Sequence, residues 1–248
     1  MEQITTATPG PEAPQERFSR IWASAMECLQ EQAWAEAEGL LWRLWQLEAT
    51  PPWELCDALG FCLLQQGCYD LCETVLRPAL TQPGCSFWVS HKLGDALLGQ
   101  NRLAEAARWY QEAERSGSDS PLTARNLMQA LYPINPQECL RILQHWHQQA
   151  STPDAFWEGV REAALVLPSL GLAEWLWNHH RGDGACRRRL LEARCLALDV
   201  PGCWRLLASN PAWGAWETAL AQRLQQLGLG QQLQTQALAH DGGDAIGG

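Results

Sequence analysis

Apolar residues recur every three or four positions along most of this chain, and polar residues fill the positions between them. This spacing is the period of an amphipathic α-helix, so the pattern predicts an all-α fold. The first apolar stripe consists of Phe18, Ile21, Ala25, Cys28 and Leu29, and the second of Trp34, Ala37, Leu40, Leu41 and Leu44. Pro51 and Pro52 follow the second stripe, and we expect them to end the first pair of helices.

One segment of the chain returns 34 residues later. The first copy contains Leu59, Gly60, Leu63, Gly67, Tyr69 and Cys72, and the second contains Leu93, Gly94, Leu97, Asn101, Leu103, Ala106, Tyr110 and Ala113. A repeat of this length is typical of a helix-turn-helix unit that buries its apolar face only by stacking on its neighbours. The period and the residue order resemble the tetratricopeptide repeat (TPR).

The resemblance implies a right-handed α-solenoid of about six to seven antiparallel helix pairs, a TPR-like superhelix. We expect it to span residues 18–240, between a disordered tail at 1–17 and a flexible tail at 241–248. The best repeats cover residues 53–86 and 87–120, and the motif is degenerate after residue 121.

The two best repeats also predict how their helices pack. Gly60 and Gly94 mark a close approach of the two helices in a pair, which requires small residues on the second helix. The residues there are Cys72, Ala79, Ala106 and Ala113, and all are small. Gly67 and Asn101 occupy the turn, where both tolerate a left-handed backbone. Met128 replaces the glycine in the third copy, so we expect a wider or differently crossed pair there.

Helix pairs are predicted to continue beyond the best repeats. The expected pairs are 122–132 with 136–149, 153–167 with 170–179, 185–198 with 202–208, and 211–227 with 230–239. Asn135 and Pro136 suit an N-cap and a first helical position. Repeats at the end of an array often depart from the consensus because they cap the stack.

The chain has 28 acidic against 18 basic residues, a formal net charge of -10. A protein that binds a phosphate backbone usually presents a basic stripe, so this composition argues against a nucleic-acid partner. No stretch approaches the roughly 18 to 20 apolar residues that span a bilayer, and residues 1–17 lack the pattern of a secretory signal. We therefore expect a cytoplasmic protein without membrane insertion, whose ten cysteines stay reduced. The high ratio of arginine to lysine favours a bacterial source.

Motifs of the common enzyme classes are missing from the sequence. It contains no glycine-rich phosphate loop, no Gly-x-Ser-x-Gly elbow and no His-Glu-x-x-His. The carboxylate pairs Glu36/Glu38 and Glu112/Glu114 stand two residues apart on helices, so they point in different directions. The sequence therefore predicts no enzyme, no catalytic residue and no cofactor.

Histidines, cysteines and arginines are clustered, but each cluster has a structural interpretation. His145 with His147, and His179 with His180, cannot address one metal ion from a single helix. The group of Cys56, Cys62, Cys68 and Cys72 contains no Cys-x-x-Cys motif, and we interpret these thiols as packing residues rather than metal ligands. The run Arg187-Arg188-Arg189 is interpreted as a solvated helix start. No metal site is predicted.

The resemblance implies a binding groove along the first helices of the pairs. When the groove positions of the TPR family are transferred to this sequence one by one, they give Trp22, Met26, Asp57, Phe61, Gln65, Trp88, His91, Lys92, Asp95, Arg125, Asn126 and Gln129. Trp22, Phe61 and Trp88 would be aromatic anchors, and the charged and amide groups would set specificity. Such a mixture suits an extended peptide or a helix of a partner protein. Most other tryptophans, such as Trp109 and Trp146, are expected to be packing residues.

Some TPR proteins clamp the C-terminal carboxylates of a partner with lysines, an arginine and asparagines. Here Asp57 and Phe61 stand where the clamp has lysine and asparagine, although Lys92, Arg125 and Asn126 keep part of its chemistry. Since Asp57 would repel an acidic tail, we expect chaperone tails to be disfavoured ligands.

The preferred hypothesis is thus a protein-interaction scaffold or adaptor. The alternative is an accessory TPR module or assembly factor for a separate enzyme, such as a glycosyltransferase or methyltransferase, because bacterial TPR segments often accompany such enzymes. Co-purification of a transferase would favour it. A third hypothesis, a helical enzyme with an unrecognised site, would be supported if a metabolite strongly stabilised the protein. The sequence names neither the partner nor the oligomeric state.

Overall fold

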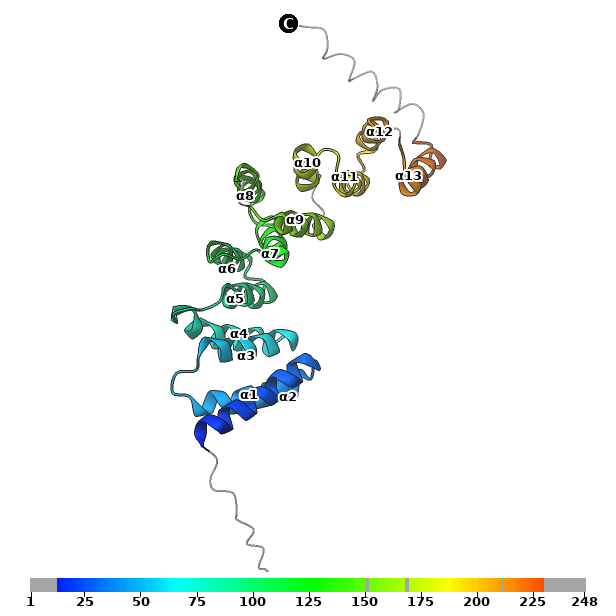
Figure 1. The fold of residues 1–248 in the computed structure, drawn as a ribbon. Helices are drawn as coiled ribbons and strands as arrows, with labels where there is room; N and C mark the ends of the chain where they lie inside the picture. Colours follow the sequence, from blue (N-terminus) through cyan, green and yellow to red (C-terminus); the bar gives the residue numbers. More distant parts are fainter. Residues whose placement is uncertain (1–12, 150–151, 168–169, 211, 230–248) are drawn as a thin grey trace, which may run out of the picture. The chain divides into compact units, whose positions relative to one another are not determined.

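A computed structural model describes residues 13–149, 152–167, 170–210 and 212–229. These residues form thirteen α-helices and one 3₁₀ helix, and no strand occurs among them (Figure 1). The predicted all-α fold is confirmed for the described part of the chain. Its contacts divide the chain into two compact units, residues 1–136 and 137–248, and each is described by itself below.

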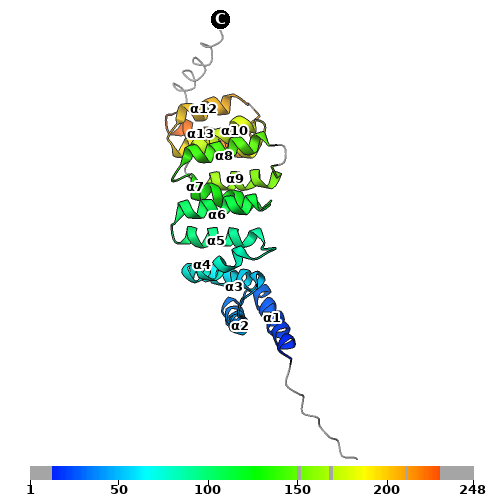
Figure 2. The same ribbon diagram turned by 90° about the vertical axis from the view of Figure 1, so that its left-hand side faces the viewer.

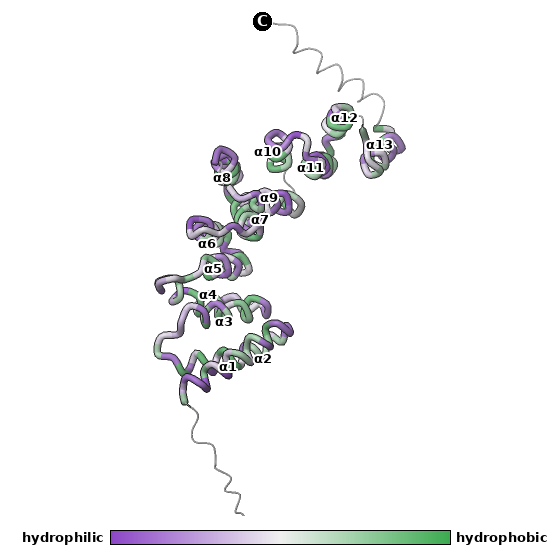
Figure 3. The backbone as a smooth tube through the Cα atoms, viewed as in Figure 1, coloured by the Kyte–Doolittle hydropathy of each residue, from purple (hydrophilic) through white to green (hydrophobic). Residues whose placement is uncertain are grey.

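Unit 1 consists of consecutive helices that pack on one another. They are α1 (Pro14–Gln30), α2 (Trp34–Leu47), α3 (Trp53–Gln65), α4 (Tyr69–Leu76), the 3₁₀ helix η1 (Arg77–Thr81), α5 (Phe87–Gly99), α6 (Leu103–Arg115) and α7 (Pro121–Leu131). Each α-helix contacts the next, and α5 also contacts α3 and α7. Figure 2 shows α4, α5 and α6 side by side, and in Figure 3 these helices carry both apolar and polar stretches. The first helices of the second, third and fourth pairs, α3, α5 and α7, therefore follow one another through direct contacts.

The first helix starts earlier than the sequence predicts. α1 begins at Pro14, four residues before Phe18, so residues 14–17 are helical rather than part of a disordered tail. Proline suits this place because its fixed φ is helical and the first amide of a helix needs no intrahelical partner. Residues 1–12 of the expected tail lie outside the described residues.

One type of turn recurs between the two helices of a pair. The left-handed residues are Gln32, Gly67 and Asn101, with φ of 59°, 72° and 59°. After each of them an N–H bonds a carbonyl five residues back, as in Ala33 N to Cys28 O at 2.8 Å and Arg102 N to Leu97 O at 2.9 Å. This is the Schellman closure of a helix C-terminus. The turn predicted at Gly67 and Asn101 is confirmed, and Gln32 extends it to the first pair.

The close approaches predicted at Gly60 and Gly94 are also present. A Cβ atom on Gly60 would lie 2.6 Å from Leu76 Cδ2, and one on Gly94 would lie 2.6 Å from Tyr110 Cε1. The predicted small residues on the facing helices, Cys72, Ala79, Ala106 and Ala113, are all fully buried. Cys72 Sγ even reaches the carbonyl of Gly60 at 3.3 Å. The absence of side chains at these glycines lets the paired helices touch.

Unit 2 contains the remaining helices. They are α8 (Pro136–Gln148, whose first residue belongs to unit 1), α9 (Asp154–Val166), α10 (Leu170–His179), α11 (Gly184–Leu196), α12 (Val200–Ala208) and α13 (Ala215–Gln226). Trp204, Leu191 and Leu207 lie at the centre of a core to which α10, α11, α12 and α13 contribute. The turn between α11 and α12 repeats the closure seen in unit 1, with Leu198 at φ 58°.

One helix boundary in unit 2 depends on a residue that the apolar period does not reveal. α13 starts at Ala215 rather than at 211, because the side chain of Glu217 accepts a hydrogen bond from the N–H of Gly214 at 3.1 Å and caps the helix there. The other predicted helix of that pair, 230–239, and the predicted tail 241–248 lie outside the described residues.

The interpretation of the arginine run as a solvated helix start is wrong for Arg187. Its side chain is 5% exposed, and Nη2 donates to the carbonyls of Leu206 and Asn210 at 3.1 Å each. Nη1 lies 3.8 Å from Glu217 Oε1. Arg187 therefore satisfies carbonyls at the end of α12 and connects α11 to both following helices. Arg188, in contrast, is exposed and lies over the Trp216 ring.

Candidate functional site

Nine of the twelve predicted groove residues line one hollow in unit 1. They are Phe61, Gln65, Trp88, His91, Lys92, Asp95, Arg125, Asn126 and Gln129. The hollow, of about 540 Å³, lies along α3, α5 and α7 and is called the groove hollow below. Five further residues line it that sequence reasoning missed: Leu64, Tyr69, Leu98, Gly99 and Leu122.

One of the missed residues, Tyr69, belongs to the repeat motif. The Tyr69 ring packs directly on Gly99, where a Cβ atom would lie 2.5 Å from Tyr69 Cε1. Tyr69 belongs to the motif that defines the repeat, but its contact with the next helix pair cannot be read from one repeat alone. Leu122 is 39% exposed and adds an apolar side chain at the edge of the hollow.

The three other predicted residues do not line the groove hollow. Trp22 lies on α1, where its ring stacks on Phe18 with centroids 6.4 Å apart. Met26 lies one turn further along the same helix, and both side chains are half-buried. Asp57 lies beside the hollow and bonds Lys92, which does line it. The structure thus brings together the predicted residues of the second, third and fourth helix pairs but not those of the first.

Helix α5 contributes the largest share of the predicted residues. Ser86 caps its N-terminus by accepting the Trp88 N–H at 3.3 Å. Trp88, His91, Lys92 and Asp95 then follow at intervals of three and four, so one face of α5 presents them together. The rings of Trp88 and His91 meet edge to face at 5.1 Å. The cap and the helical period together position these side chains.

A buried polar network runs beneath the groove hollow. Ser118 Oγ lies 2.8 Å from Thr123 Oγ1, which lies 2.9 Å from His91 Nδ1. His91 Nε2 is 3.4 Å from Asp95 Oδ2. Asp95 Oδ1 accepts hydrogen bonds from the Tyr110 hydroxyl at 2.7 Å and from Asn126 Nδ2 at 2.8 Å.

The Asp95 carboxylate fixes the direction of the protons in this network. A carboxylate only accepts, so Nε2 of a neutral His91 carries the proton and its Nδ1 accepts from the Thr123 hydroxyl. The order hydroxyl, imidazole, carboxylate is that of a nucleophilic triad. However, Thr123 is 1% exposed and no substrate carbonyl could reach its oxygen. The network therefore holds α5, α6 and α7 together beneath the hollow.

Tyr110 acts as a donor in the same network. Burial raises the pKa of the Tyr110 phenol well above its ordinary value, and the neighbouring Asp95 carboxylate raises it further. The phenol therefore stays protonated and continues to donate to Asp95 throughout the neutral and mildly alkaline pH range.

The charged groups at the groove hollow have hydrogen-bond partners within the protein. Lys92 Nζ donates to Asp57 Oδ1 at 2.6 Å and lies 5.5 Å from the centre of the Phe61 ring. Arg125 Nε donates to Asn126 Oδ1 at 3.1 Å. The Asp95 carboxylate has the three donors described above. The walls therefore combine apolar rings and aliphatic side chains with charged groups that already have partners.

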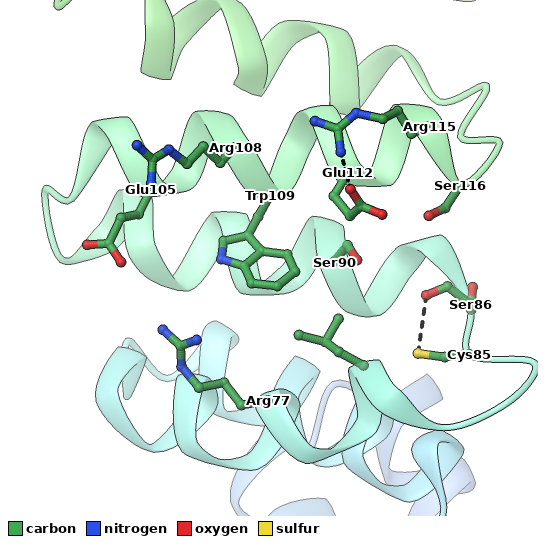
Figure 4. Close-up of a pocket in the computed structure, with 11 residues that line it drawn as sticks. Arg77, Cys85, Ser86, Ser90, Glu105, Arg108, Trp109, Glu112, Arg115 and Ser116 are labelled. Carbon is green, nitrogen blue, oxygen red and sulfur yellow. Dashed lines mark hydrogen bonds and ion pairs between the residues drawn. The ribbon is translucent and has the colours of Figure 1, made fainter.

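A second hollow lies on another side of α5 and is not predicted by the sequence. It has a volume of about 650 Å³ and is lined by Arg77, Leu80, Cys85, Ser86, Ser90, Glu105, Arg108, Trp109, Glu112, Arg115 and Ser116. Figure 4 shows the indole of Trp109 pointing from α6 toward the segment that carries Arg77. Two of its arginines have partners close in sequence: Arg77 bonds Glu73 and Arg115 bonds Glu112. Trp109, expected to be a packing residue, is thus partly exposed in a hollow, whereas Trp146 is buried at 2% exposure as expected.

Unit 2 gathers the histidines that the sequence treats as separate pairs. The ring centre of His147 lies 4.9 Å from that of His179 and 6.1 Å from that of His180. The rings of Trp157 and Trp175 stack beside them at 5.8 Å. The Nε2 atom of His180 is buried and has no hydrogen-bond partner among the described residues. Across the described ranges, no three histidine, cysteine or acidic side chains are arranged to hold a metal ion.

The comparisons with known proteins do not assign this chain to a family. No protein-family model matches the sequence, and no curated protein is significantly similar to it. Within the residues that the structure describes, no helix has both the length and the apolar character needed to cross a membrane.

Proposed function

We propose that the chain is a protein-interaction scaffold, a right-handed TPR-like α-solenoid that binds an extended peptide or a helix of a partner in the groove hollow. The same left-handed turn in the pairs α1–α2, α3–α4 and α5–α6 supports the solenoid, as do the glycine contacts at Gly60 and Gly94. About six to seven helix pairs follow one another in the sequence.

The arrangement of the groove hollow is the observation that carries this proposal. Positions in the repeat alone select the residues from α3, α5 and α7, without reference to any pocket, and nine of the selected residues line a single hollow. Neighbouring repeats that present equivalent positions to one surface form the extended binding face of a helical-repeat protein. The hollow combines aromatic anchors with polar groups that are held in place from below.

The pairing of charges indicates what kind of partner segment fits. Because Lys92 is bonded to Asp57 and Asp95 has three donors, a charged ligand would have to displace an existing partner. An apolar or aromatic side chain can instead pack on Trp88, Tyr69 and Leu122 without breaking any of these bonds. We therefore expect a partner segment with apolar anchors, bound with little dependence on salt concentration.

A peptide library displayed on phage provides the test, with the full chain as bait. Selected peptides should lose binding to the variant that combines Trp88→Ala and Arg125→Glu. Leu122→Glu should weaken binding at least tenfold, because it places a charge at the apolar edge of the hollow. It should disturb folding little, since Leu122 is 39% exposed.

Leu71→Glu is the matched control for this test. Leu71 lies on α4, is 50% exposed and does not line the groove hollow, so its replacement should leave peptide binding unchanged. Trp109→Ala, in the second hollow, should also have no effect. If peptides bind all these variants as tightly as the unmodified chain, the groove hollow is not the binding site.

A further inference from the structure

Two cysteines of unit 2 lie within reach of one another. Cys195 is in the last turn of α11 and Cys203 is in α12, and their Sγ atoms are 3.6 Å apart. The turn between them is closed by the Asp199 N–H, which bonds the carbonyl of Arg194 at 2.8 Å. Since Leu198 adopts the left-handed conformation there, α12 folds back on α11 and brings the sulfurs together.

The two sulfurs differ in their access to solvent. Cys203 is 1% exposed and belongs to the core around Trp204 and Leu191. Cys195 is only partly buried, at the margin of the same core. A small reagent in solution can therefore reach Cys195 first, while Cys203 is reached only from Cys195.

Their hydrogen bond makes the exposed thiol the more acidic of the two. The Cys203 thiol donates to Cys195 Sγ and lowers the pKa of Cys195 to about 7, against the opposing effect of burial. The same bond, together with burial, raises the pKa of Cys203. A carbonyl oxygen, that of Leu191, lies 3.9 Å from Cys203 Sγ as a second acceptor.

The other buried cysteines have the opposite character. Burial raises the pKa of Cys56 and Cys62 to about 11 and that of Cys72 and Cys139 to about 12. Thiolates rather than thiols react with oxidants and alkylating agents, so these residues should be inert at neutral pH. Cys195 alone combines partial exposure, a lowered pKa and a second thiol in contact.

We propose that Cys195 and Cys203 are a reversible dithiol–disulfide site that responds to peroxides. The Cys195 thiolate attacks one peroxide oxygen, which forms an S–O bond, breaks the O–O bond and leaves a sulfenic acid and hydroxide. The Cys203 sulfur then attacks the sulfenic sulfur, forms the S–S bond and releases its proton and the hydroxyl group as water. Overall, two thiols and one hydrogen peroxide give a disulfide and two waters.

The geometry requires only a local change to reach the product. The sulfurs must come closer by about 1.6 Å to reach an S–S bond of about 2.0 Å, which side-chain rotation and small helix shifts can provide. A dithiol reductant reverses the reaction by thiol–disulfide exchange. This inference is independent of the groove hollow, which lies in unit 1.

Peptide mapping of the native full chain tests the proposal directly. Trypsin cleaves after Arg194 and Arg205, so a single peptide, 195–205, carries both cysteines. After mild treatment with hydrogen peroxide and blocking with iodoacetamide, this peptide should be two hydrogens lighter than the unblocked dithiol and carry no blocking group. Dithiothreitol added before the blocking step should restore both thiols.

Two comparisons make the test specific. In Cys203→Ala the Cys195 sulfenic acid should persist and react with dimedone, and the pH midpoint of Cys195 alkylation should rise from about 7 toward the ordinary thiol value of about 8.5. Cys186 is a buried cysteine in the same helix as Cys195, α11, and serves as the control. In Cys186→Ala the disulfide should form as in the unmodified chain. In urea, which unfolds the chain, peptide 195–205 should no longer be oxidised in preference to the peptides that carry the other cysteines.

The proposal is overturned if peptide 195–205 keeps both thiols while Cys28 or Cys68, which are also partly buried, become oxidised. It is also overturned if Cys195 forms its disulfide with a cysteine other than Cys203.

Discussion

The carboxylate of Asp57 on α3 accepts a 2.6 Å hydrogen bond from the ammonium group of Lys92 on α5. Lys92 is the only lysine in the sequence, and it is committed to this contact between two successive helix pairs. The sequence suggests that Asp57 would repel an acidic ligand, but in the structure its charge is matched. We still expect an acidic tail to be a poor ligand, but for another reason, since the lysine that could clamp it is already bonded to Asp57.

Replacing one partner of this pair should destabilise unit 1. Both side chains are largely buried, at 15% exposure for Lys92 and 23% for Asp57, so Lys92→Ala leaves a carboxylate with little access to water. We expect a loss of about 1 to 2 kcal/mol in the free energy of unfolding, between the values for exposed and fully buried pairs. Urea denaturation of single and double variants measures it.

A charge swap separates the pair interaction from other effects. The double variant Asp57→Lys with Lys92→Asp should recover part of the stability that each single reversal loses. Arg115→Ala is the control, because Arg115 pairs with Glu112 at 65% exposure and should cost under about 1 kcal/mol. Additive effects of the two reversals would contradict a direct interaction.

A glycine-to-alanine series should measure the close helix contacts. In Gly94→Ala the new methyl meets the Tyr110 ring, which cannot move aside because its hydroxyl is bonded to Asp95. We expect a loss of about 1 to 3 kcal/mol. Gly60→Ala should cost less, since it meets the flexible end of Leu76. Thermal unfolding followed by circular dichroism would rank the variants.

Gly39 provides the control for this series. It lies in α2, and a methyl group added there would have no neighbouring atom within 4 Å. Gly39→Ala should therefore stabilise the chain by up to about 1 kcal/mol through helix propensity alone. Equal losses at Gly60 and Gly94 would show that the mobility of the facing side chain does not decide the cost.

The repeat makes much of unit 1 predictable from the sequence. The 34-residue repeat predicts the close contacts at Gly60 and Gly94 and the turns at Gly67 and Asn101. The helical period predicts which face of α5 carries the residues from Trp88 to Asp95. Periodicity assigns each side chain to a face of its helix, and equivalent faces of stacked repeats meet. That is why nine of the residues that line the groove hollow can be selected from the sequence.

Other features depend on contacts that periodicity does not encode. The burial of Arg187 requires the carbonyls at the end of α12, and the gathering of His147 with His179 requires α8 and α10 to pack together. The second hollow forms where three segments leave a gap around Trp109. Each is a property of several elements at once, whereas the sequence pattern describes one helix at a time.

The buried guanidinium of Arg187 should be essential to unit 2. Arg187→Ala removes the donor to the Leu206 and Asn210 carbonyls and leaves Glu217 without its nearest cation. We expect a loss of about 3 kcal/mol, in the range for buried charged hydrogen bonds and ion pairs. Arg187→Lys should recover little, because an ammonium group cannot reproduce the planar fork.

Arg188→Ala is the neighbouring control, measured in the same urea titrations. Arg188 is exposed and bonds Glu192 at 3.0 Å, so its removal should cost under about 1 kcal/mol. If both alanine variants lose the same stability, Arg187 does not hold the three helices together.

Unit 2 should lose stability as the pH falls from 7 to 5 because of His180. Burial lowers the pKa of His180, and the nearby His147, Arg161 and His179 lower it further, while Asp183 opposes them. In the unfolded chain the histidine has a pKa of about 6.5, so as the pH falls it takes up a proton before His180 of the folded chain does. His180 therefore has little effect on stability above about pH 6.5, and stability decreases as the pH falls below that value.

Asp183 does not affect the stability of unit 2 between pH 7 and 5. Burial alone would raise its pKa, but the Ala185 N–H, the Cys186 thiol and Arg161 together lower it. Its stabilising effect is present above its unfolded pKa of about 3.9 and disappears only at more acidic pH. Asp183 therefore adds no loss of stability between pH 7 and 5, and the variants below separate His180 from the other groups.

Urea midpoints at pH 5, 6 and 7 for the unmodified chain and two variants test the role of His180. His180→Gln should flatten the decrease toward acidic pH, because no proton is then excluded from the buried site. His145→Gln should leave it unchanged, since His145 is exposed and bonds only Gln149 among the described contacts, at 2.7 Å. A decrease that is equally steep in all three proteins would assign the pH dependence to other groups.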